Sequence, residues 1–125
     1  MNFQTAITTC FRKYVDFGGR ARRSEYWFFA LYSILAAVAA QIVDRFVDPP
    51  AADVPYAVGI VYIVVVLANF LPGLAVTVRR LHDTNRSGWW FLIVLVPLLG
   101  AILLIVWFCT KGTKGDNRFG PDPAA

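Results

Sequence analysis

Long apolar runs separated by short polar segments are the main feature of the chain. Three runs, residues 26–43, 55–78 and 89–109, contain no Asp, Glu, Lys or Arg. About 20 apolar residues are enough for a helix to cross a bilayer. The pattern therefore predicts an all-α membrane protein in which residues 1–125 form a single membrane domain with three hydrophobic helical segments.

The segment before the first run, residues 1–17, has a different period. Its apolar side chains recur at helical spacing, with polar ones on the other side, as in Phe3, Ile7, Cys10, Phe11 and Tyr14 against Gln4, Thr8, Arg12 and Lys13. This pattern is typical of an amphipathic helix that lies in the headgroup region of a membrane. The alternative is a soluble helix that docks on another protein.

The third run contains Pro97 and Gly100 and permits two topologies. Residues 89–109 either cross the membrane, which puts the polar tail, residues 110–125, opposite the N-terminus, or re-enter at residues 96–100, which returns the tail to the N-terminal side. The positive-inside rule favours re-entry, because it gathers nearly all Lys and Arg on one side. The unbroken length of 21 residues favours a crossing, which we expect.

Composition and charge agree with a membrane protein. The chain is 58% hydrophobic and 16% charged, against about 25% charged in soluble domains. Because the basic residues behind the net charge of +4 flank apolar runs, we expect them to meet anionic lipid rather than nucleic acid. The two cysteines form no disulfide framework and have no metal-ligand spacing, so neither a metal nor a cofactor is expected.

Two polar segments, residues 19–27 and 79–90, are predicted to share one membrane face in either topology. We call them together the arginine cap. Five Lys and Arg residues precede the first run, three lie between the second and third, and one lies between the first and second. The N-terminus and the arginine cap are therefore predicted to be cytoplasmic, as in a multi-pass protein of the bacterial inner membrane.

Each segment of the arginine cap has arginines, then a serine, then two aromatic residues. The arginines are Arg20, Arg22, Arg23, Arg79, Arg80 and Arg86, and the aromatic residues, predicted interface anchors, are Tyr26, Trp27, Trp89 and Trp90. Serine at a helix start is a favoured cap, and arginine beside a helix N-terminus suits a phosphate or carboxylate. We expect the arginine cap to bind an anionic lipid headgroup or a protein partner, and a second copy of this chain is one candidate for that partner. The alternative is that the arginines only fix topology.

Glu25, His82 and Asp83 are not needed for anchoring. Glu25 and Asp83 are expected to form salt bridges with the arginines, and His82 to bond a carbonyl. An alternative hypothesis is an enzyme that acts on a lipid headgroup, in which His82 is a general base oriented by Asp83. No recognised catalytic motif accompanies these residues, so a non-enzymatic protein is preferred. A third hypothesis is an oligomeric transporter. The lack of charged residues within the apolar runs argues against it.

The chain resembles a bacterial family of small inner-membrane proteins, the domain of unknown function 805. The resemblance rests on three ordered segments, FGGRARRSEYW at residues 17–27, RRLHDTNRSGW at residues 79–89 and GTKGDNRFG at residues 112–120. Gly18 stands where a polar residue is usual. The resemblance implies an integral protein of the cytoplasmic membrane and no particular activity. It also implies that the tail, with Asn117 and Arg118, is ordered.

Overall fold

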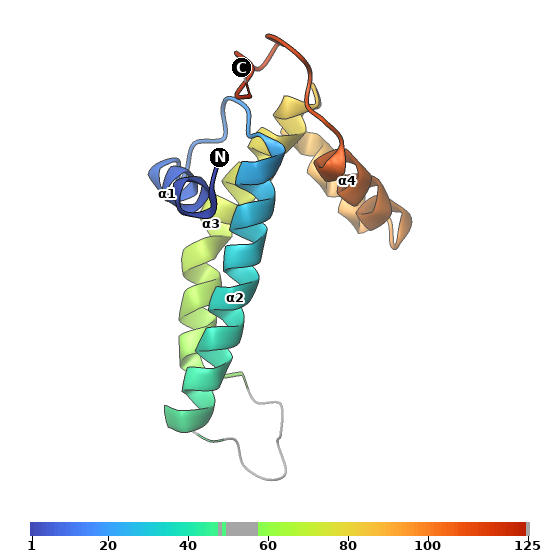
Figure 1. The fold of residues 1–125 in the computed structure, drawn as a ribbon. Coiled ribbons are helices and arrows are strands. Elements are labelled where there is room, and N and C mark those ends of the chain that lie inside the picture. The colour runs from blue at the N-terminus through green and yellow to red at the C-terminus, as the bar shows by residue number, and fades with distance from the viewer. Residues whose placement is uncertain (48, 50–57, 125) are drawn as a thin grey trace.

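The computed structural model describes residues 1–47, 49 and 58–124, and in that part of the chain every regular element is a helix (Figure 1). The elements are α1 (Phe3–Arg12), α2 (Arg23–Val47), α3 (Ile60–Asp83), the 3-10 helix η1 (Gly88–Leu95) and α4 (Leu99–Cys109). Helices α2 and α3 lie side by side, and both are long and apolar enough to cross a membrane. The predicted all-α membrane fold is confirmed to this extent. Residues 55–57 of the second predicted span lie outside the described residues.

Both long helices extend beyond their apolar runs at the end that carries the arginine cap. Helix α2 begins at Arg23 rather than at residue 26, and α3 continues to Asp83 rather than ending near residue 78. The sequence RRLHD, which follows the second apolar run, therefore forms the last turn of α3. Cationic side chains in a last turn interact favourably with the helix dipole, and here Arg80 occupies that position.

The other end of the α2–α3 pair is held by a side chain of α2. The Asp44 carboxylate accepts hydrogen bonds from the backbone N–H groups of Val61 (3.0 Å) and Tyr62 (2.9 Å). These are two of the donors that the first turn of a helix leaves unpaired. A Cβ atom on Gly59 would lie 2.0 Å from Asp44 Cγ, so the close approach of α2 to the start of α3 requires glycine.

Helix α1 packs across α2 and α3 near the arginine cap (Figure 1). The Asn2 side chain caps its first turn, and its buried face carries Ala6 and Cys10. Phe11 makes edge contacts with Phe29 and Tyr32 of α2. Its apolar face therefore contacts protein, whereas the predicted position in the headgroup region stays a prediction.

A second contact ties the residues after α1 to the interior of α3. Pro72 lies inside α3 and has no N–H to donate to the carbonyl of Ala68, four residues earlier. The Tyr14 hydroxyl donates to that carbonyl at 2.7 Å. The tyrosine thus satisfies the backbone group that the proline leaves free.

The third apolar run differs from the expected straight crossing. It forms η1 and α4, which are folded back on each other with a break at residues 96–98 (Figure 1). Leu98 has a positive φ of 63° at the break. Gly100 lies so close to η1 that a Cβ there would be 1.7 Å from the Ile93 carbonyl oxygen, and the Trp90 and Trp107 rings meet edge to face. The chain reversal brings the tail back to the end of the molecule that carries the N-terminus.

Candidate functional site: the arginine cap and the docked tail

The two segments of the arginine cap meet directly. The backbone N–H of Ala21 donates to the carbonyl of Arg79 at 2.9 Å, and Ala21 is fully buried. This contact places the start of α2 beside the end of α3. The two segments therefore lie together at one end of the α2–α3 pair, whereas their common position on one face of a membrane stays a prediction.

The first buried ion pair joins α2 to α3. Arg79 Nη1 lies 2.5 Å from Glu25 Oε1, and neither side chain is more than 3% exposed. The Cys10 thiol of α1 lies 3.8 Å from the same Glu25 oxygen. Burial and, to a smaller extent, the nearby Glu25 carboxylate raise the pKa of Cys10 to about 12, so this thiol is neutral at physiological pH and acts as a small apolar side chain.

Asp83 is the centre of the second cluster and binds two arginines. Its Oδ1 lies 2.9 Å from Arg20 Nη2, and its Oδ2 lies 2.6 Å from Arg80 Nη1. A Cβ on Gly112 would lie 2.0 Å from Asp83 Oδ2. The tail can therefore pass over this carboxylate only because residue 112 is glycine.

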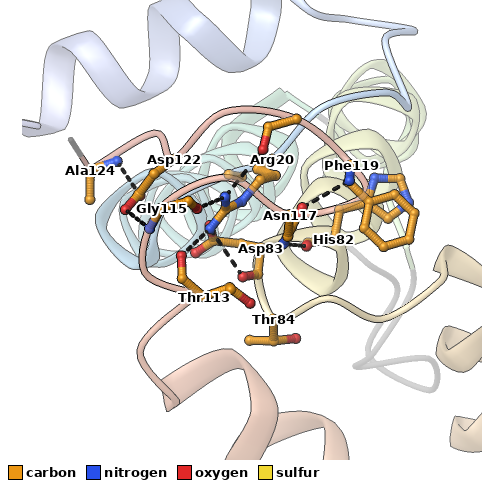
Figure 2. A network of polar contacts seen from close by, with 12 residues as sticks. Arg20, His82, Asp83, Thr84, Thr113, Gly115, Asn117, Phe119, Asp122 and Ala124 are labelled. Carbon is orange, nitrogen blue, oxygen red and sulfur yellow. Dashed lines mark hydrogen bonds and ion pairs between the residues drawn. The ribbon is translucent and has the colours of Figure 1, made fainter.

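Arg20 also binds the tail through backbone carbonyls (Figure 2). Its Nη1 donates to the carbonyls of Gly115 (2.6 Å) and Gly120 (3.3 Å), and its Nη2 donates to that of Thr113. In return the Thr113 N–H donates to the Asp83 carbonyl at 2.7 Å. One guanidinium thus joins the cap carboxylate to three points of the tail.

The tail reaches His82 through two further residues. Asn117 Nδ2 donates to the His82 carbonyl at 2.9 Å, and Phe119 stacks parallel on the His82 ring with centroids 4.0 Å apart (Figure 2). Asn117 Oδ1 accepts from the Phe119 N–H. Arg118 reaches back to the Asn85 carbonyl at 3.3 Å. The family resemblance implied an ordered tail, and its contacts agree with that.

The end of α4 is bound by the arginine cap as well. Arg80 donates through Nε (3.1 Å) and Nη2 (3.0 Å) to the carbonyl of Phe108 and through Nη2 to that of Thr110. Trp27 Nε1 also donates to the Phe108 carbonyl. Helix ends leave such carbonyls unpaired, so one buried arginine satisfies the last turn of α4 and fixes it to α3.

The six predicted binding arginines therefore fall into two groups. Arg20, Arg79 and Arg80 are enclosed by protein and occupied with carboxylates and carbonyls. Arg22 and Arg86 are half-buried and Arg23 is exposed. Arg86 stacks over the Trp107 ring at 4.4 Å, and Arg23 donates to the Cys109 carbonyl.

The predicted aromatic anchors also divide. Trp89 is 79% exposed, and Trp27 and Trp90 are exposed in part of their surface. Tyr26 instead packs on Phe108 with ring centroids 4.5 Å apart. Of the two serines, Ser87 caps η1 through the Trp89 N–H, whereas Ser24 lies within the first turn of α2 and its Oγ has no hydrogen-bond partner among the described residues.

His82 and Asp83 are not arranged as a catalytic pair. His82 Nδ1 lies 2.9 Å from the Gly19 carbonyl oxygen, and both carboxylate oxygens of Asp83 face arginines. Among residues 1–47, 49 and 58–124 no group of three His, Cys, Asp or Glu side chains forms a metal site. The geometry assigns His82, Asp83 and Glu25 to the internal contacts of the cap.

Sequence reasoning missed several residues that hold this structure. Asp44 was assigned no role. An acid three residues before the end of one helix and a glycine just before the start of the next were nevertheless visible signals that the acid could cap the second helix. The role of Tyr14 required knowing that Pro72 leaves the Ala68 carbonyl free. Gly112 was part of a motif without a physical reason, which its contact with Asp83 now supplies.

Comparison with known proteins agrees with the membrane fold. The model of a family described as "Protein of unknown function (DUF805)" matches residues 14–121. The chain is 45% identical over 112 residues to "Inner membrane protein YhaI" of Escherichia coli (strain K12), which covers 90% of this chain and 89% of the relative. It is equally similar to "Inner membrane protein YhaH" of the same strain, with 90% of each chain covered. No solved structure matches. The chain therefore belongs to the DUF805 family of proteins of unknown function.

Proposed function

We propose that this integral inner-membrane protein binds the phosphate of an anionic lipid headgroup at the start of α2, through Arg22 and Arg23. The observation that carries the proposal is the division of the arginines. Arg20, Arg79 and Arg80 are occupied inside the protein, whereas Arg22 and Arg23 have no carboxylate partner in the described part of the chain. Arg86 also lacks a carboxylate partner there but stacks over the Trp107 ring, which leaves Arg22 and Arg23 as the arginines of the cap that keep their charge for a ligand.

The surroundings of Arg23 suit a headgroup with its acyl chain. A cavity of about 370 Å³ is lined by Arg23, Ser24, Trp27, Phe28 and Cys109. The N-terminus of α2 carries a partial positive charge and unpaired N–H groups, and Ser24 Oγ is an additional unused donor. Trp27 and Phe28 offer an apolar surface for the chain below the phosphate.

The distribution of charge supports a cytoplasmic position for this site. Arg45, near the far end of α2, is the only one of the twelve Lys and Arg residues that lies away from the arginine cap, the tail and α1. By the positive-inside rule such an asymmetry favours a cytoplasmic position for the arginine cap, the N-terminus and the tail. Anionic lipid is abundant on that face and attracts basic residues by about 1 kcal/mol each.

The alternative functions have less support. An enzyme centred on His82 and Asp83 lacks the required contact between the two side chains. An ion-coupled transporter needs ionisable groups within the span. The buried Asp, Glu, Arg and His residues in the described parts of α2 and α3 all lie near the helix ends, and they are Glu25, Asp44, Arg79, Arg80, His82 and Asp83.

Native mass spectrometry of the protein released from its own membrane tests the proposal. The parent is expected to retain an anionic phospholipid that an Arg22→Gln/Arg23→Gln variant loses. The matched control is Arg12→Gln/Lys13→Gln, which removes the same charge at the end of α1 and should keep the lipid. Loss of lipid from both variants alike, or retention by both, would contradict binding at the start of α2 and would direct attention to a protein partner.

A further inference from the structure

A second cavity lies between α3 and η1. It has a volume of about 530 Å³, within the range of small-molecule sites. One wall is formed by Leu74, Val78 and His82, which follow each other at intervals of one helical turn on α3. Trp89 and Leu92 of η1 form part of the opposite wall. At 1.5 Å per residue the cavity runs about 12 Å along α3, away from the arginine cap.

The lining has two polar side chains at the cap end and is apolar below them. No Lys, Arg, Asp or Glu lines it, and the polar members are His82 and Ser87. The cavity is therefore unsuited to an anionic headgroup, which needs cations. It fits a lipid with a neutral polar end and an apolar body.

The hydrogen bonds already made by these two residues define what is left for a ligand. The Gly19 carbonyl can only accept, so His82 Nδ1 carries the hydrogen of the neutral ring. Nε2 is then an acceptor, and it has no hydrogen-bond partner among the described residues, although His82 is only 9% exposed. Ser87 Oγ already accepts from the Trp89 N–H, which leaves its hydroxyl hydrogen to donate.

We infer that this cavity binds a neutral lipid that ends in a hydroxyl group. A hydroxyl both donates and accepts, so it can donate to His82 Nε2 and accept from Ser87 at once. An ammonium group can only donate, and an ester can only accept. The apolar body of the lipid lies along Val78 and Leu74, toward the interior of the membrane. This site is separate from the headgroup site at α2 and does not depend on it.

Two ligand pairs test the inference with the full chain in phosphatidylcholine nanodiscs at pH 8. They are dioleoylglycerol with its acetate ester, and geranylgeraniol with its acetate ester, each titrated by native mass spectrometry. In at least one pair the free alcohol is expected to bind about five-fold more tightly, as befits a hydrogen bond that the ester cannot donate. The pair that shows the difference identifies the apolar body.

Three variants locate the effect. Leu74→Trp fills the end of the cavity farthest from His82 and should weaken binding of the alcohol at least ten-fold. Leu67→Trp, on an exposed part of α3, should leave the affinity for the alcohol unchanged. His82→Phe should make alcohol and ester equal. Equal binding of alcohol and ester to the parent, or equal effects of the two tryptophan variants, would overturn the inference, and neither result depends on the folding of the His82 variant.

Discussion

Individual side chains of the arginine cap are used mainly to hold the protein together. Three arginines and two carboxylates are buried at one end of the molecule, in pairs no longer than 2.9 Å. Burying such charges is expensive unless each is paired and hydrogen bonded. The many carbonyl acceptors around Arg20 and Arg80 provide that compensation, whereas Arg79 keeps two nitrogens without partners in the described chain.

Glu25→Gln should strongly destabilise the protein, because it leaves the Arg79 charge buried without a counter-ion. The expected loss is about 3–5 kcal/mol in the free energy of unfolding, measured by denaturant titration in micelles. Asp16→Asn removes a carboxylate that is exposed and should change stability by less than about 0.5 kcal/mol. The double variant Glu25→Gln/Arg79→Gln should recover part of the loss. Equal effects of the Glu25 and Asp16 variants would show that the buried pair is not formed.

The two cysteines should differ widely in reactivity. Cys10 is buried with its pKa raised to about 12, whereas Cys109 is exposed. Because the thiolate is the nucleophile, maleimide at pH 7.5 should modify Cys109 readily and Cys10 only after unfolding, as mass spectrometry of peptides would record. Modification of Cys10 in the Cys109→Ser variant at the rate of an exposed thiol would contradict the packing of α1 on Glu25.

The sequence analysis identified the arginines of the cap but did not distinguish those that are buried in the protein from those that keep an exposed surface. Arg22 and Arg23 have the same chemistry and nearly the same neighbours in the chain as Arg20. The difference arises because Ala21 is bound to the Arg79 carbonyl and α2 starts at Arg23, which directs Arg20 toward Asp83. Such a choice depends on tertiary contacts, which hydropathy and motif spacing do not contain.

Among the helices, apolar length predicted α2 and α3 well and the third segment poorly. Hydropathy measures how strongly a segment avoids water, and it carries no information on whether the segment forms one straight helix. Residues 89–109 are apolar throughout, yet the chain turns at Pro97, and the close contact between α4 and Ile93 requires Gly100. Both residues were visible in the sequence, and the asymmetry of positive charge favoured the fold-back over the length-based expectation.

Gly100→Ala should open the contact between η1 and α4. The added Cβ would meet the Ile93 carbonyl, a backbone group that cannot rotate away, and overpacking of this kind costs about 1–3 kcal/mol. Thermal unfolding in micelles measures the loss. Ala101→Leu adds more volume at the next position, which is exposed, and should be nearly neutral. Comparable losses in the two variants would argue against the folded-back hairpin.

Asp44→Ala should weaken the far end of the α2–α3 pair. It removes the acceptor for two N–H groups in the first turn of α3, and the loss of a helix cap costs about 1 kcal/mol. Hydrogen exchange of the Val61 and Tyr62 amides should rise with it. Arg45→Ala is the matched control, since Arg45 is exposed at the adjacent position. Unchanged protection of these two amides would remove Asp44 from this role.

Over the whole molecule, the three family segments form one structure. The segment that begins α2 supplies Arg20 and Glu25, the end of α3 supplies Arg79, Arg80 and Asp83, and the tail covers them (Figures 1 and 2). The tail can do so only because the third apolar segment returns it to the N-terminal end. The tail can cover the arginine cap only if the third apolar segment folds back, so a test of the topology is also a test of the closed cap.

Accessibility of single cysteines in spheroplasts tests that claim most directly. In a Cys10→Ala/Cys109→Ser background, one cysteine is placed at Asp16, Pro49 or Pro121, all of which are exposed, and a membrane-impermeant maleimide is added before or after lysis. The position in the tail, Pro121, should behave like Asp16 and label only after lysis, while Pro49 labels in intact spheroplasts. If Pro121 instead labels in intact spheroplasts together with Pro49, the third segment crosses the membrane and the tail cannot close the arginine cap.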